Sequence, residues 1–201
     1  MIVEFATFVV LVEAPAVHPG FEAIPPAHPP QLGADLLARV GAIARGRPLR
    51  YVVITHHHSD HIGSVADVVN DQTTVLADQD AAPLVQRLIA RLPDSSPGRR
   101  ARVVAVSGSF EVADSTRTLI VQDVGRNPHT NHNLFAWLPR ERIGFQGDLF
   151  YYDAGMGSPP DRMVMNRFFA GWIADQKLDP HGVYGVHSSG AAGAAVIRAS
   201  R

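Results

Sequence analysis

Hydrophobic and polar positions follow two kinds of pattern along this chain, and each pattern predicts one kind of secondary-structure element. Short runs rich in Val, Ile and Phe predict buried strands, whereas apolar residues three or four positions apart predict helices with one buried face. Strands are expected over residues 5–12, 49–55, 73–77, 102–106, 118–121, 133–138, 143–146 and 183–186. Helices are expected from Gln31 to a stop at Gly46 and over 64–70, 82–92 and 161–178. Strands and helices therefore alternate early in the chain, and its middle part is mostly β.

A proline-rich stretch, residues 14–30, predicts a surface loop that carries His18 and His28. We interpret these two histidines, and His181 beside another proline, as surface residues. Neither a linker nor an internal repeat divides the sequence, so we expect one domain over residues 1–201.

The composition is that of a globular protein, with 46% hydrophobic and 18% charged residues. Apolar runs stay well below the ~20 residues that span a bilayer, and the first of them lies between Glu4 and Glu13 instead of following a basic segment. We therefore expect a cytoplasmic protein without a signal peptide. A formal net charge of -1 gives no basic face for nucleic acid or anionic membranes, so a small molecule is the expected partner.

The chain contains no cysteine. Disulfides, thiolate nucleophiles, iron-sulfur clusters and thiolate-bound zinc are therefore excluded. Any metal ion must be held by histidine and carboxylate side chains.

A dense group of such side chains follows the strand expected over residues 49–55. Alternate residues of an extended segment share a face, so His56 and His58 can hold one ion together, while His57 points the other way. Asp60 and His61 stand where the chain turns and can reach a second ion beside the first. Strand ends are where α/β proteins commonly place their functional sites.

The spacing His56-x-His58-x-Asp60-His61 resembles the signature of the metallo-β-lactamase superfamily, and in particular its lactonase and glyoxalase branch. This resemblance implies an α+β fold, a four-layer αβ/βα sandwich that binds two metal ions. It also predicts three further ligands in a fixed order along the chain.

Candidates for all three ligands are present. His129 precedes an expected strand, Asp148 follows the strand expected over 143–146, and His187 follows the last expected strand. The resemblance assigns His56, His58 and His129 to one ion and Asp60, His61 and His187 to the other, with Asp148 bridging both.

The implied chemistry is hydrolysis by a metal-bridging hydroxide. Two divalent cations lower the pKa of a shared water toward ~7 and polarise the scissile group. Asp60 would be the catalytic residue that orients this water. Nitrogen and oxygen donors suit zinc best and also accept iron, manganese or cobalt.

The substrate class follows from two residues. True β-lactamases of the superfamily generally have a cysteine or a non-bridging residue where this chain has Asp148, whereas glyoxalases, lactonases and phosphodiesterases carry an aspartate. Tyr151 stands at the spacing at which lactonases place a tyrosine that hydrogen-bonds the ester oxygens, and its alternative interpretation is a packed tyrosine between Phe150 and Tyr152. We therefore expect a hydrolase of a lactone, ester or related acyl bond.

Other activities stay open at this point. β-Lactam hydrolysis is one alternative, and phosphodiester hydrolysis is another, although the chain lacks a basic excess. A persulfide dioxygenase would hold a single iron with the equivalents of His56, His129 and Asp148. A non-catalytic metal-binding module is a further hypothesis. It would be excluded if a chelator abolished ester or lactone turnover.

Some positions depart from the resemblance. One strand alone is expected before the first helix, so the N-terminal sheet is expected to be short, with an open edge that a second copy in a homodimer or the 14–30 loop would cover. Glu13 stands where relatives often have an aspartate that hydrogen-bonds a metal-binding histidine. His132 stands where relatives usually have glycine, as an alternative ligand ranked below His129, and Ser64 replaces another glycine at a helix start.

Overall fold

The computed structural model describes residues 1–15, 32–153 and 162–201. These residues form two compact units, Met1–Val106 and Ser107–Arg201, each built around its own sheet. The expectation of one domain over 1–201 stays a prediction, and the two units are described separately. Most of the proline-rich stretch, including His18 and His28, lies outside the described residues.

The first unit, Met1–Val106, contains a five-stranded sheet in the order β1-β2-β3-β4-β5. Strands β2 to β5 are parallel, and β1 pairs antiparallel with β2. Because the carboxyl ends of parallel strands meet at one edge, residues that follow β2 and β3 lie near each other. The strands are β1 Ile2–Glu4, β2 Val9–Val12, β3 Leu49–Ile54, β4 Thr74–Ala77 and β5 Arg102–Ala105.

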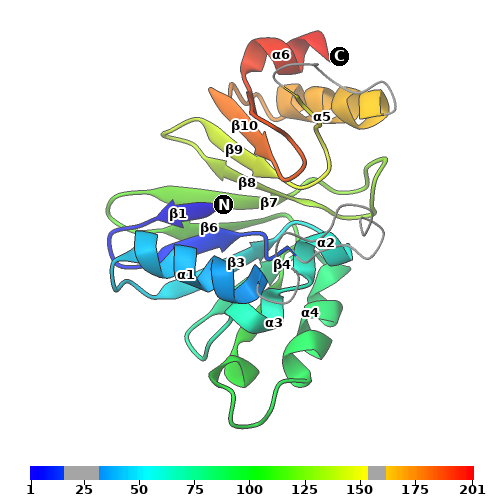
Figure 1. The fold of residues 1–201 in the computed structure, drawn as a ribbon. Helices are drawn as coiled ribbons and strands as arrows, with labels where there is room; N and C mark the ends of the chain where they lie inside the picture. The colour runs from blue at the N-terminus through cyan, green and yellow to red at the C-terminus, as the bar shows by residue number, and fades with distance from the viewer. Residues whose placement is uncertain (16–31, 154–161) are drawn as a thin grey trace. The chain divides into compact units, whose positions relative to one another are not determined.

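Helices cover one face of this sheet (Figure 1). Their buried residues, such as Val40, Val65 and Val85, share a core with Val52 and Ile54 of β3. This burial of aliphatic surface holds the sheet and its helices together. The helices are α1 Leu32–Ala44, α2 Ser59–Ile62, α3 Val65–Val68, α4 Ala81–Ala90 and the 3-10 turn η2 Pro97–Arg100.

The start of the chain differs from the expectation. The sequence predicted one strand over 5–12, whereas the structure has two strands joined by a turn, in which the Phe5 N–H donates to the Phe8 carbonyl at 3.0 Å. The two phenylalanine rings stack with centroids 4.5 Å apart. Their apolar character made the turn resemble part of a strand, while Ile2–Glu4 is too short for a visible alternation. The first sheet is therefore not reduced to a single N-terminal strand.

The second unit, Ser107–Arg201, contains a six-stranded sheet in the order β11-β10-β9-β8-β7-β6. Only β9 and β10 are parallel neighbours among these described strands. The carboxyl ends of β7, β9 and β10 and the amino end of β8 consequently share one sheet edge. The strands are β6 Ser109–Ala113, β7 Thr118–Asp123, β8 Leu134–Leu138, β9 Ile143–Gln146, β10 Gly182–Gly185 and β11 Ala191–Ala192.

Two helices of the second unit, α5 Met163–Asp175 and α6 Ala194–Ala199, pack on the sheet (Figure 1). An aromatic core forms where Phe135 of β8 meets Phe169 and Trp172 of α5, with ring centroids 5.6 and 5.3 Å from that of Phe135. We predicted no element at β6, β11 or α6 from the sequence, and β11 and α6 span only 2 and 6 residues. Among the described residues, no helix has both the length and the apolar character needed to cross a membrane.

Candidate metal centre

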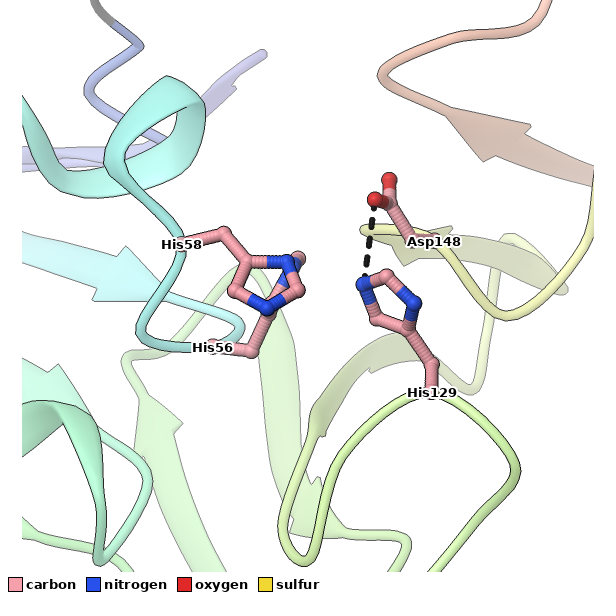
Figure 2. Close-up of side chains that lie close together, drawn as sticks. All are labelled: His56, His58, His129 and Asp148. Atoms are coloured by element: carbon pink, nitrogen blue, oxygen red, sulfur yellow. Dashed lines mark hydrogen bonds and ion pairs between the residues drawn. The ribbon is translucent and has the colours of Figure 1, made fainter.

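The first unit presents two histidines on the extended turn after β3. His56 is 0% exposed, and its Nδ1 lies 3.0 Å from the hydroxyl of Thr55. Its Nε2 lies 3.1 Å from Nδ1 of His58, so two ring nitrogens converge (Figure 2). This pairing matches the expectation that alternate residues of the turn share a face.

Two further donors follow where the chain turns into α2. His61 is buried, and its Nε2 lies 3.6 Å from Oδ2 of Asp60. The rings of His56 and His61 have centroids 4.1 Å apart. The first unit thus brings all four of its expected ligands onto one short segment and divides them into two pairs.

Glu13 supports this segment from the end of the neighbouring parallel strand. Its Oε2 lies 3.4 Å from Nδ1 of His61, and its side chain is 3% exposed. The residue has φ 71°, a left-handed conformation that is costly for a non-glycine, and its N–H donates to the Val53 carbonyl at 2.8 Å. Burial lowers the pKa of the Met1 amine, and the Glu13 carboxylate acts in the opposite sense. A carboxylate beside Nδ1 fixes the orientation of the His61 ring.

The second unit presents three donors at the shared edge of its sheet. Oδ2 of Asp148 lies 3.2 Å from Nε2 of His129, which stands in the loop before β8 (Figure 2). Oδ1 of Asp148 lies 3.5 Å from Nε2 of His187, which follows β10. Each oxygen of one nearly buried carboxylate therefore faces a different imidazole.

Gln146, which the sequence analysis missed, shapes the turn that carries Asp148. Its side-chain oxygen accepts the N–H groups of Leu149 and Phe150 at 2.7 and 3.1 Å, and its amide donates to the Phe150 carbonyl at 2.7 Å. These bonds satisfy backbone groups that would otherwise be buried without partners. A glutamine at the end of a strand gives no sequence signal for this role.

Tyr151 lies beside the donor His187. The two rings are nearly parallel, with centroids 6.5 Å apart, and the Arg162 guanidinium lies 4.6 Å from the tyrosine ring centre. The Asn166 side chain holds the Tyr151 backbone by two hydrogen bonds of 2.8 Å. The residue is only 8% exposed, so part of the alternative interpretation, a packed tyrosine, is also met.

The donor separations suit metal coordination. Two ligands on one tetrahedral zinc ion, each at roughly 2.0–2.1 Å, are about 3.3 Å apart. The pairs within each unit are separated by 3.1, 3.2, 3.5 and 3.6 Å. These His and Asp residues belong to sets that could hold metal ions. The sharing of ions between the two units stays a prediction.

Comparisons with known proteins identify the superfamily of the chain. A model of the beta-lactamase superfamily domain matches residues 27–184, and the chain therefore belongs to this superfamily. This membership confirms the resemblance to the superfamily seen in the sequence. The Beta-lactamase-like protein 2 homolog of Caenorhabditis elegans is 30% identical over 100 residues, which are 50% of this chain and 30% of that protein. The match thus spans less than a third of the relative's length.

Solved structures support the fold. The metallo-beta-lactamase FIM-1 from Pseudomonas aeruginosa, in its mono-zinc form, is 20% identical with a TM-score of 0.66, covering 99% of this chain and 79% of its own. A metallo-beta-lactamase from Pontibacter korlensis is 19% identical with a TM-score of 0.59, covering 98% and 81%. The expected α+β fold of the superfamily, with its two sheets, is confirmed.

Proposed function

We propose that this chain is a binuclear metal-dependent hydrolase that cleaves a lactone, ester or related acyl bond of a small molecule. The observation that carries this proposal is the position of Asp148. Its two oxygens face two different histidines, at 3.2 and 3.5 Å. A carboxylate held in this way suits a ligand that bridges two cations.

The division of the remaining donors supports two ions. In the first unit, His56 pairs with His58, and His61 lies beside Asp60. Nitrogen and oxygen donors without any thiolate favour zinc, with iron or manganese as alternatives. The proposed ligands are His56, His58 and His129 for one ion, Asp60, His61 and His187 for the other, and Asp148 for both.

Asp60 and Tyr151 would have separate roles in the reaction, beside that of the cations. Two bound cations would lower the pKa of a water toward ~7 and polarise the scissile carbonyl. The Asp60 carboxylate, 20% exposed, would accept a hydrogen bond from that water and hold its orientation. The Tyr151 hydroxyl would donate to the ester oxygen as negative charge develops there.

Asp148 and Tyr151 also carry the choice of substrate. An aspartate at the bridging position favours acyl esters and lactones over β-lactams, and Tyr151 lies beside the proposed ligand His187. The absence of a basic excess argues against nucleic-acid phosphodiesters.

A substrate panel on metal-quantified protein tests this proposal. Lactone, ester, thioester, β-lactam and phosphodiester substrates should be assayed on protein with two zinc ions per chain. We expect turnover of a lactone or ester that a chelator abolishes and added zinc restores. One iron per chain with oxygen consumption would instead indicate a persulfide dioxygenase, and metal binding without any turnover would indicate a binding module.

The Asp60→Ala variant tests the assigned catalytic role. Loss of the water-orienting carboxylate should reduce turnover by about 10²–10⁴-fold, the usual contribution of such a group. The side chain is 20% exposed and is not among the buried residues of the short helix α2, so circular dichroism should show an unchanged fold. His181→Ala, at an exposed histidine before β10, is the matched control and should retain full turnover. Undiminished rates in Asp60→Ala would contradict the role.

A further inference from the structure

The loop between β7 and β8, residues 124–133, is held by side chains that the proposed chemistry does not use. It carries the proposed ligand His129, and its base is closed by the Val124 N–H, which donates to the Asn133 carbonyl at 2.8 Å. Gly125, with φ 75°, makes the turn that leaves β7. Within the loop, the side chains of Asp123 and Asn127 accept hydrogen bonds from backbone N–H groups.

Asp123, the last residue of β7, contacts both arms of the loop. Its Oδ1 accepts the Gly125 N–H at 2.8 Å, and its Oδ2 lies 2.8 Å from Nδ1 of His132. The carboxylate side chain is 8% exposed and the imidazole 29%. An ionised carboxylate only accepts hydrogen bonds, so Nδ1 of His132 carries the proton in this contact.

A continuous chain of hydrogen bonds links this pair to His129. The Thr130 hydroxyl donates to the His132 carbonyl at 2.7 Å. The Asn127 amide donates to the Thr130 hydroxyl at 3.3 Å, and its oxygen accepts the His129 and Thr130 N–H groups at 2.9 Å each. The backbone of the proposed ligand is thus fixed through the same network that contains His132.

We propose that the Asp123–His132 pair is a latch for this loop and that His132 is a positioning residue for His129. The proposal rests on the function proposed above, because it assigns His129 to a metal ion. The ring of His129 already aims its Nε2 at Asp148, 3.2 Å away, so a fixed backbone at this point fixes a donor atom.

The latch limits the conformations available to the loop that carries His129. A loop that samples several conformations presents His129 in the binding geometry only part of the time, and the apparent metal affinity falls by that fraction. Contacts that orient a ligand in this way typically change metal affinity by about 10–100-fold when they are removed. A partly exposed ion pair contributes little to global stability by comparison.

Zinc affinity of two substitutions at one position tests the latch. In His132→Ala the Asp123 contact is lost, and competition with a chromophoric chelator should show zinc affinity weakened by about 10–100-fold. In His132→Asn an amide nitrogen can replace Nδ1, so most of the affinity should return. The thermal midpoint should stay close to that of the wild type in both variants.

Amide hydrogen exchange of the metal-free protein gives a readout independent of turnover. The Gly125, His129 and Thr130 amides should exchange faster in His132→Ala and at the wild-type rate in His132→Asn. His181→Ala should change neither exchange nor zinc affinity.

The remaining outcomes separate the two proposals. Unchanged zinc affinity in His132→Ala would overturn the latch alone. Weakened affinity without rescue by His132→Asn would make His132 itself a ligand and would also overturn it. A wild-type chain that binds no zinc would overturn the proposed function, and the role of His132 with it.

Discussion

The two units differ in how they assemble their donors. In the first unit, His56, His58, Asp60 and His61 lie on one turn and the start of one short helix. In the second, His129, Asp148 and His187 come from three separate segments, which meet because the amino end of β8 and the carboxyl ends of β9 and β10 lie at the same sheet edge.

This difference separates two ways of building a site. The donors of the first unit depend mainly on the local path of the chain, since neighbouring residues of an extended turn share a face without help from distant segments. The donors of the second unit depend on sheet register and on side chains that hold loops, such as Gln146 and Asn127. We therefore expect the second set to be more sensitive to substitutions around it.

The largest effect on metal content and turnover is expected when one proposed ligand from each unit is replaced and the two variants are compared. Asp148→Ala removes the carboxylate that faces both His129 and His187, so the binding of both ions should be weakened. Turnover should fall by at least about 10³-fold, because a metal ion stabilises the transition state by several kcal/mol. His58→Ala removes a donor from one pair only and should leave about one ion per chain. Elemental analysis after dialysis measures the difference. If His58→Ala lost both ions and Asp148→Ala kept one, the expectation that Asp148 serves both ions would be contradicted.

A glycine at the sheet edge tests the sensitivity of the second unit. A Cβ at Gly185 would lie 2.4 Å from the Gln146 amide nitrogen and 2.8 Å from the Ser188 hydroxyl, so Gly185→Ala should displace Gln146. We expect a loss of about 1–3 kcal/mol in unfolding free energy, as for overpacked cores, together with weaker zinc binding.

A glycine in α5 provides the control for this change. A Cβ at Gly171 meets nothing within 4 Å, and alanine in a helix is favoured by about 0.5–1 kcal/mol over glycine. Gly171→Ala should therefore raise the urea midpoint slightly and leave zinc binding unchanged. Equal stability of the two variants would show that the sheet edge tolerates the added methyl.

The smallest expected effect concerns the substrate rather than the metal. Tyr151→Phe keeps the ring beside His187 and removes only the hydroxyl, so kcat/KM for a lactone should fall about fivefold, the value of one hydrogen bond. Zinc content should not change. Tyr184→Phe, at a tyrosine 41% exposed, should leave the rate unaltered. Equal rates for Tyr151→Phe and wild type would assign Tyr151 to packing.

The sequence pointed to candidate ligands more readily than to the residues that support them. Ligand candidates could be found because histidine and aspartate at fixed spacing are rare and chemically specific, as in the segment from His56 to His61. Gln146, Asp123 and Asn127 could not be found, because their roles depend on backbone groups brought near them by the fold. Hydrogen bonds to such groups leave no periodic pattern in the sequence.

Prediction failed at a few elements for a related reason. The run Leu49–Ile54 gave a strand close to the predicted one, whereas β6 was missed and β11 has only 2 residues. Phe5 and Phe8 placed aromatic side chains in a turn. In these places tertiary packing, and not the local pattern, decides the structure.

The antiparallel strand β1 determines how the sheet of the first unit ends. It is 3 residues long, and its Glu4 carboxylate is tied to the Arg47 guanidinium. So short and charged a border is a poor template for a strand from another molecule. Fibril growth by addition of strands at this border is disfavoured, and the fully buried, apolar β2 is covered on this side by its pairing with β1.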